Sequence, residues 1–378
     1  IGYCAFFNCS NLTSITIPES LTSIDYQTFY NCSSLTSITI PEGVTTIGEK
    51  AFYSCSNLTN ITISDSVTEI QNYAFENCFG LESITMPDSV ISINGTAFYN
   101  CGNLKEIHVS SLDYWLSHHF APSLNYEDFG TRISSYHLFA GDEELSDITI
   151  PEGTTSIDGG LFAGCSGLKS IEIPEGVTSI EPMAFSGCSG LTEITIPDGV
   201  TRIGNNPEGS LAFEYCTNLR RISIPDSVTF IGDCTFSHCS SLESITLPKN
   251  LTSLGQWGQT FEYCTSLKSI VIPDGVYRIG YYLFDGCTNL TSVTLPTRLE
   301  GLYIGGYAFR NCSSLISVSI PNRITNICES AFEGCTALQS ISIPARTTNI
   351  YENAFKGCTA LEKAAFLQAT ATTFTIDP

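Results

Sequence analysis

Hydrophobic residues recur along this chain in a short pattern that repeats about every 23 residues. In one copy, the β-branched alternation of Leu35–Ile40 predicts a short strand, and Pro41–Gly43 predicts the turn that ends it. Val44–Ile47 then predicts a second extended piece, and Ala51–Cys55 predicts a tight bend or one helical turn that returns the chain. Each copy is therefore expected to form one coil of backbone.

A ladder of cysteines gives the length of the repeat. Fourteen of the 17 cysteines fall mostly 23 residues apart, each with a Phe three residues before it and a Leu three residues after it. The same frame returns at Phe139, Asp142 and Leu145, with Asp in the cysteine position, so we expect about fifteen units. The ladder cysteines are Cys9, Cys32, Cys55, Cys78, Cys101, Cys165, Cys188, Cys216, Cys239, Cys264, Cys287, Cys312, Cys335 and Cys358.

A unit of this size cannot bury its own apolar side chains, but stacking on its neighbours buries them. The sequence therefore predicts a single solenoid over residues 1–378, with strands pairing in parallel from unit to unit. The repeat arithmetic leaves an insertion at about 110–130 and a degenerate C-terminal unit at 350–378. Smaller insertions at Asn205–Ser210 and Gln256–Gly258 are expected to be surface loops.

The strand motif Leu-x-x-Ile-x-Ile-Pro, the Val-Thr-x-Ile step and the Ala-Phe-x-x-Cys segment resemble the BspA-like (Treponema pallidum type) leucine-rich repeat family. The departures are local, with Ser64 and Ser110 in place of the Pro that ends the strand. The resemblance implies a β-rich leucine-rich repeat solenoid, α/β by repeat convention, with a parallel β-sheet on its concave face. It also implies a surface or secreted protein of an anaerobic host-associated microbe, linked to adhesion and without a catalytic motif.

The charge balance narrows the classes of partner. The chain has 38 acidic residues against 16 Lys and Arg, a formal net charge of −22. Phosphates and anionic lipids need a basic surface, so this composition argues against nucleic-acid binding and against adhesion to anionic membranes. No run of 18 apolar residues occurs, so we expect no direct membrane insertion. The first residue already lies inside the repeat, and any signal peptide or anchor is expected outside this sequence.

The cysteines are expected to serve as packing residues. Ladder cysteines occupy an apolar position and point the same way in successive coils, which is poor geometry for a disulfide. We predict a column of buried thiols, which fits a reducing or anaerobic setting. Cys4, Cys234 and Cys328 lie off the ladder and too many coils apart to pair with one another.

The turn after each strand repeats Pro-Glu or Pro-Asp, which predicts a column of carboxylates along one edge. One interpretation is a Ca²⁺ site or a docking edge for a basic partner, and the other is a set of soluble turn residues. A straight column supplies too few converging oxygens for each ion, which favours the second interpretation. The acidic turn residues are Glu19, Glu42, Asp65, Asp88, Glu152, Glu175, Asp198, Asp226 and Asp274.

Side chains that point out of the strands form the candidate binding surface. Most are Ser or Thr, which are common on solvent-facing strands. The middle units instead carry charged and aromatic residues beside the largest insertion, and a loop that interrupts a regular array is a natural place for function. The candidate binding residues are Lys105, Glu106, His108, Tyr114, Trp115, His118, Asp147, Lys169, Glu172, Glu193, Arg220 and Arg221.

The insertion has two interpretations. Tyr114 and Trp115 are either exposed interface anchors or part of a short amphipathic helix, beginning near Leu112, that packs on the side of the solenoid. His118 and His119 are a poor basis for a metal site because adjacent histidines rarely ligate one ion well.

No nucleotide-binding, serine-hydrolase or zinc-protease motif occurs, so we expect no enzyme, no catalytic residues, no cofactor and no metal. The sequence favours a non-enzymatic recognition module, at the cell surface or secreted, that binds a host matrix or cell-surface protein through the concave sheet and the 110–130 insertion. One alternative is a carbohydrate-binding module in which Tyr114, Trp115 and Tyr136 stack on a glycan. The other is a passive structural spacer for another domain.

Overall fold

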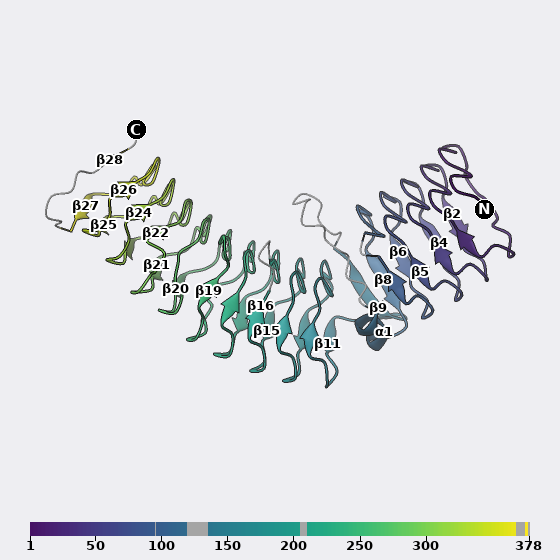
Figure 1. The fold of residues 1–378 in the computed structure, drawn as a ribbon, viewed down its shortest axis with the longest axis horizontal. Coiled ribbons are helices and arrows are strands. Elements are labelled where there is room, and N and C mark those ends of the chain that lie inside the picture. Colours follow the sequence, from purple (N-terminus) through teal and green to yellow (C-terminus); the bar gives the residue numbers. More distant parts are fainter. Residues whose placement is uncertain (95, 119–134, 205–209, 368–374, 377–378) are drawn as a thin grey trace. The chain divides into compact units, whose positions relative to one another are not determined.

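The alternating motif forms short strands that pair in parallel from one turn of the chain to the next (Figure 1). The computed structural model describes residues 1–94, 96–118, 135–204, 210–367 and 375–376. The chain divides into two compact units. Unit 1 is Ile1–Ile148 with Gly160–Lys169, and unit 2 is Thr149–Gly159 with Ser170–Pro378. The predicted parallel-strand solenoid is confirmed in both units.

Unit 1 contains two ladders of strands. In the three-residue strands of the first ladder the middle residue, such as Ile38, is buried and its two neighbours are exposed, as the alternation predicts. The second ladder consists of two-residue strands that follow the proline turn. The first ladder comprises β2 (Ser37–Thr39), β4 (Asn60–Thr62), β6 (Ser83–Thr85), β8 (Glu106–Val109) and β9 (His137–Ala140), and the second comprises β1 (Ser23–Ile24), β3 (Thr46–Ile47), β5 (Glu69–Ile70) and β7 (Ser92–Ile93).

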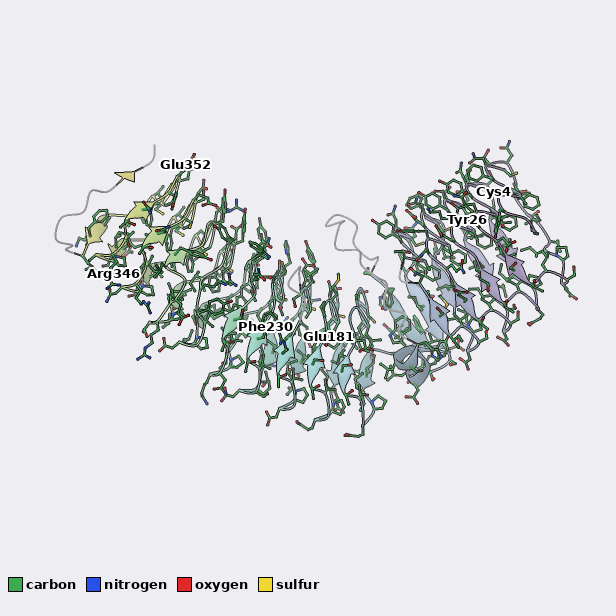
Figure 2. The ribbon with its side chains drawn as sticks, viewed as in Figure 1. Cys4, Tyr26, Glu181, Phe230, Arg346 and Glu352 are labelled. Atoms are coloured by element: carbon green, nitrogen blue, oxygen red, sulfur yellow. The ribbon has the colours of Figure 1, made fainter. Side chains whose placement is uncertain are left out.

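Unit 2 repeats both ladders, and the degenerate last unit still contributes paired strands. Arg346 lies at the edge formed by the proline turns and Glu352 at the opposite edge (Figure 2). The first ladder comprises β13 (Ser170–Glu172), β15 (Glu193–Thr195), β17 (Arg221–Ser223), β20 (Ser269–Val271), β21 (Ser292–Thr294), β23 (Ser317–Ser319), β25 (Ser340–Ile343) and β27 (Lys363–Phe366). The second comprises β12 (Ser156–Ile157), β14 (Ser179–Ile180), β16 (Arg202–Ile203), β18 (Phe230–Ile231), β19 (Ser253–Leu254), β22 (Tyr303–Ile304), β24 (Asn326–Ile327), β26 (Asn349–Ile350) and β28 (Thr375–Ile376). β11 (Asp147–Thr149) spans the division between the units.

Columns of phenylalanine rings form the core of each unit. In unit 1 the rings from Phe6 to Phe98 stack face to face with centroids 5.2 to 5.3 Å apart. In unit 2 the column from Phe185 to Phe355 has spacings of 5.1 to 5.8 Å. Each inner ring is therefore covered by the turn before it and the turn after it, which is how a 23-residue turn buries its apolar side chains.

The thiol ladder is present and has a hydrogen-bonding role. The Cys55 Sγ donates to the backbone oxygen of Phe29 in the preceding turn at 3.2 Å, and the Cys287 Sγ donates to that of Phe261 at 3.0 Å. The same carbonyl of Phe29 also accepts the backbone N–H of Cys32 at 3.1 Å. A cysteine at this position thus combines the volume of a small apolar side chain with a donor that links adjacent turns.

We expect most of these thiols to be unreactive in the folded protein. Burial raises the pKa of Cys32 to about 11 and that of Cys239 well above its usual range, so very little reactive thiolate forms at neutral pH. Cys4 and Cys9 are exposed. Titration with a thiol reagent should modify these two rapidly and the half-buried Cys358 more slowly, and the 14 buried thiols should react only after denaturant is added. Fast modification of the ladder in the native protein would contradict this packing.

The prediction of a repeat unit with Asp142 in the cysteine position is wrong. Leu138 is fully buried in β9, which pairs in parallel with β8, so alternation turns Phe139 outward to stack on His108 at 4.7 Å. Asp142 is exposed in the turn of an antiparallel hairpin between β9 and β10 (Glu143–Glu144), where Gly141 takes a φ of +61°. The Phe and Cys pattern therefore occurs fourteen times along the chain, in agreement with about fourteen turns.

Candidate functional site

Charged residues occupy part of the strand face, defined as the outward side chains that stand four, five and seven residues after each ladder cysteine. In unit 2, Glu172, Glu193 and Arg221 are exposed on three successive strands, β13, β15 and β17. Glu193 lies opposite Arg221 in the parallel pairing, and the Arg221 Nη2 donates to the Glu193 Oε2 at 3.1 Å. Both side chains are largely in solvent, so this ion pair adds little to stability and stays accessible to a partner.

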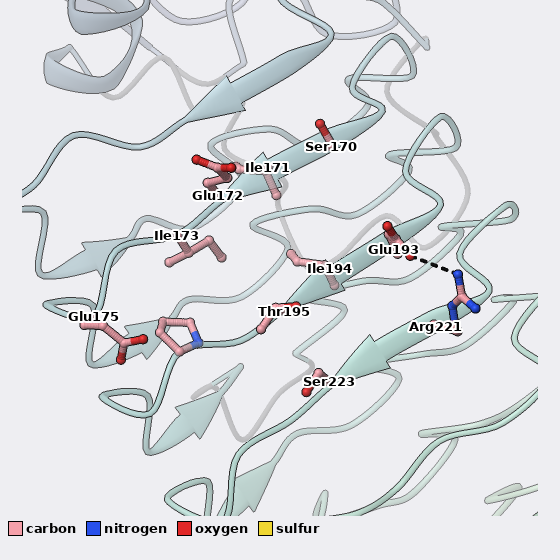
Figure 3. A pocket seen from close by; sticks show the side chains of 11 residues that line it. Ser170, Ile171, Glu172, Ile173, Glu175, Glu193, Ile194, Thr195, Arg221 and Ser223 are labelled. Atoms are coloured by element: carbon pink, nitrogen blue, oxygen red, sulfur yellow. Dashed lines mark hydrogen bonds and ion pairs between the residues drawn. The ribbon is translucent and has the colours of Figure 1, made fainter.

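A shallow depression of about 540 Å³ lies over these strands (Figure 3). Three carboxylates and one guanidinium contribute to its lining, which makes the depression negative overall, and hydroxyls supply neutral hydrogen-bonding groups. This arrangement suits a ligand surface that brings positive charge and hydrogen-bond donors. The polar lining residues are Ser170, Glu172, Glu175, Glu193, Thr195, Arg221 and Ser223.

The next ion pair on this face was not predicted from the sequence. The Lys268 Nζ donates to the Glu243 Oε2 at 2.7 Å. Lys268 lowers the pKa of Glu243, and Arg220 and Arg221 act in the same direction, so Glu243 lies within the field of all three cations. Glu243 and Lys268 both stand four residues after a ladder cysteine, as Arg220 does. Their position in the repeat could therefore have identified them from the sequence.

Other predicted residues belong to unit 1. His108 lies on β8 with its Nδ1 2.9 Å from the Gly141 oxygen, and it borders a depression of about 610 Å³ that Asp65, Asp88 and Asp142 also line. Within the ranges that the structure describes, no three His, Cys, Asp or Glu side chains are arranged to hold a metal ion. Apart from those of the insertion, the predicted site residues assigned to unit 1 are exposed or half-buried, and they are Lys105, Glu106, His108, Asp147 and Lys169.

The prediction that Tyr114 and Trp115 are exposed anchors is wrong. They lie on α1 (Leu112–Ser117) and are 7% and 2% exposed. The Trp115 Nε1 donates to the Leu161 oxygen at 3.1 Å, and the Tyr114 hydroxyl donates to the Val90 oxygen at 2.6 Å. The helix packs on unit 1 as the second interpretation expected, because an amphipathic segment buries its aromatic side.

The rest of the predicted insertion contributes no exposed anchor in the described residues. His118 follows α1, is half-buried, and has its Nδ1 2.9 Å from the Tyr114 oxygen. Residues 119–134, including His119, lie outside the described residues. Among the described residues, α1 is the only helix, and with six residues it is too short to cross a membrane.

The acidic turn residues have a structural explanation. The Asp226 Oδ1 accepts the backbone N–H of Lys249 in the next turn at 2.9 Å, and the Asp274 Oδ1 accepts that of Thr297 at 2.7 Å. Hydrogen bonds from Lys249 and Thr297 lower the pKa of the two carboxylates. These acids thus link adjacent turns, which supports the interpretation as turn residues.

The ladders, the ring column and the hydroxyl-rich strand face define a leucine-rich repeat protein built as a parallel β-solenoid. The BspA type leucine-rich repeat region matches this chain in six copies over residues 1–127, 131–257, 209–302 and 257–375. The chain therefore belongs to the BspA-type leucine-rich repeat family, and the resemblance drawn from the sequence is confirmed.

Solved structures of bacterial proteins share this fold. A leucine-rich repeat protein from Bacteroides ovatus is 28% identical with a TM-score of 0.57, and the match covers 96% of this chain and 81% of that one. A leucine-rich cell surface protein from Faecalibacterium prausnitzii is 30% identical with a TM-score of 0.56, over 94% and 87% of the two chains. A leucine-rich repeat protein from Eubacterium ventriosum, at 24% identity and a TM-score of 0.51 over 86% and 83%, supports the fold alone.

No curated protein matches the chain. The family and these structures identify a repeat scaffold of a kind that is suited to protein interaction and is typically non-enzymatic.

Proposed function

We propose that this chain is a non-enzymatic adhesion module, displayed on a cell surface or secreted, that binds a protein partner through the strand face of unit 2. The observation that carries the proposal is the charge pattern of Glu193, Arg221, Glu243 and Lys268 on neighbouring turns. The F. prausnitzii relative, described as a cell surface protein, supports the location. The proposal treats residues 1–378 as one repeat domain, which the family match along the chain supports.

The chemistry of the face suggests the kind of partner. An exposed ion pair can open and pair with charges on a binding protein at a low free-energy cost, because its charges are already solvated and the strands fix their positions. The surrounding Ser and Thr hydroxyls offer hydrogen bonds without adding charge. A host matrix or cell-surface protein with a basic patch and a few matched acids would complement this surface, and its association should weaken as salt is raised.

A charge-exchange variant tests the proposal. Glu193→Arg combined with Arg221→Glu keeps the ion pair and the net charge but inverts the pattern that a partner meets. Binding to purified host extracellular matrix proteins, measured by biolayer interferometry, should weaken at least tenfold in this variant, since opposed like charges replace matched ones.

The uncharged part of the same face provides the control. Ser340→Ala with Ser342→Ala on β25 alters two exposed hydroxyls and should leave the affinity within about twofold. A charge-exchange variant that binds the matrix proteins as tightly as the unaltered chain, with unchanged circular dichroism, would overturn the assignment of this surface.

A further inference from the structure

Trp257 is an exposed indole on a rigid bulge of unit 2. Its side chain is 61% exposed. The carboxylate of Asp233, in the preceding turn and 4% exposed, accepts the backbone N–H groups of Gln256, Trp257 and Gly258 at 3.0, 2.8 and 2.7 Å. Three hydrogen bonds to one buried carboxylate fix the bulge, so the expected surface loop is a preorganised platform for one large aromatic ring.

A second aromatic ring lies on the next turn. The Tyr281 N–H donates to the Trp257 oxygen at 2.9 Å, and the Tyr281 ring extends over Gly306. A Cβ at residue 306 would lie 3.1 Å from the Tyr281 Cδ1 and 2.6 Å from the Glu329 Oε1. The absence of a side chain at Gly306 therefore makes room for a phenol ring and a carboxylate side by side. The Tyr303 ring follows, with its centroid 6.4 Å from that of Tyr281.

Planar polar groups flank these rings, since the Glu329 carboxylate lies beside Tyr281 at Gly306 and the Arg278 side chain hydrogen-bonds to Tyr303. The Arg278 guanidinium lies 4.9 Å from the centroid of the Tyr277 ring and donates from Nη2 to its hydroxyl at 2.8 Å. Together with the Glu329 carboxylate it offers paired donors and acceptors beside the aromatic surface. We call Trp257, Arg278, Tyr281, Tyr303 and Glu329 the aromatic edge.

The composition of the aromatic edge selects one class of ligand. Nucleic-acid bases also stack on such rings, but a chain of net charge −22 repels their phosphates. A protein anchor is normally enclosed by packed apolar groups, whereas Trp257 stands on a protruding bulge flanked by glycines. A pyranose needs an open aromatic face for its C–H groups and planar polar side chains for its hydroxyls, and the aromatic edge supplies both.

We propose that the aromatic edge is a saccharide-binding site, separate from the strand face assigned to a protein partner. It replaces the glycan site expected from the sequence, because Tyr114, Trp115 and Tyr136 are 7%, 2% and 4% exposed and offer no open ring face. Trp257 supplies the principal stacking platform and Tyr281 a second one.

The test combines a glycan array with tryptophan fluorescence of the full chain. The chain should bind defined saccharides on an array of bacterial, plant and host glycans. Titration with the strongest of these should shield the indole from acrylamide, because Trp257 is the accessible one of the two tryptophans and Trp115 is buried. Trp257→Ala should weaken binding at least tenfold, and Tyr281→Ala several-fold.

Two controls separate this proposal from the previous one. Tyr3→Ala removes an aromatic side chain in unit 1 that is 76% exposed and should leave glycan binding unchanged. The Glu193→Arg and Arg221→Glu exchange should likewise leave glycan binding unchanged, so either proposal can fail alone. A chain that binds no saccharide on the array, or a Trp257→Ala variant that binds as tightly as the unaltered chain, overturns the proposal. The loss of a protein partner in Trp257→Ala, without glycan binding, would make the edge a protein contact instead.

Discussion

Replacing Phe284 with alanine is expected to lower the free energy of unfolding by about 3–5 kcal/mol. The ring is fully buried and stacks on Phe261 at 5.6 Å and on Phe309 at 5.4 Å, so truncation opens a cavity that two neighbouring turns share. The backbone cannot collapse into that space, because parallel ladders on both sides fix the distance between turns. Urea denaturation followed by circular dichroism measures the loss.

The end of the ring column offers a matched control. Phe355 stacks on Phe332 at 5.3 Å but is only partly buried, so Phe355→Ala should cost clearly less than Phe284→Ala. Equal losses at the two positions would show that stacking between turns does not dominate the stability of the column.

Removing Arg310 is expected to cost a similar amount, about 3–5 kcal/mol, for an electrostatic reason. Asp285 is fully buried, and its carboxylate accepts hydrogen bonds from the Arg310 Nε at 3.0 Å and from its Nη2. Asp285 in turn raises the pKa of Arg310, and the guanidinium lies over the Tyr307 ring at 4.8 Å. Arg310→Ala would leave a buried charge without its partner, which urea denaturation at pH 7 would report as a lower midpoint.

A double variant distinguishes the charge from the packing. Arg310→Met with Asp285→Asn removes both charges and retains much of the volume, so it should be more stable than Arg310→Met alone. If the double variant is less stable than the single variant, the buried ion pair does not account for the loss.

The fold could be predicted because every local signal agreed with the repeat. The alternation around Ile38 set the strands, the proline turn separated the two ladders, and the spacing of Phe and Cys set the period. Phe139 was misplaced because a hairpin shifted the frame while keeping a plausible spacing, and the burial of Leu138 decided the register instead. Counting the residues between repeats cannot detect such a shift when Phe139 and Asp142 still have the spacing of the repeat.

The candidate sites were harder to predict because exposure depends on contacts between turns. Glu193 and Arg221 were predicted because they occupy outward positions of the repeat, and the same rule would have identified Glu243. Trp115, a candidate anchor, is buried because its short helix packs on unit 1. Trp257, in a segment expected only to be a surface loop, is exposed on a bulge that a carboxylate 24 residues earlier fixes by hydrogen bonds. The sequence alone does not show that Asp233 turns inward to hold the bulge.

The pairing of each turn with only its two neighbours also determines how the chain would respond to traction. Hydrogen bonds run between adjacent turns along both ladders, so tension on the chain ends acts on every turn, but the outermost turn, which has only one neighbour, detaches first. Each detachment frees one period of 23 residues, which extends to about 80 Å. Such a chain peels turn by turn and lengthens under a sustained pull before its interior yields.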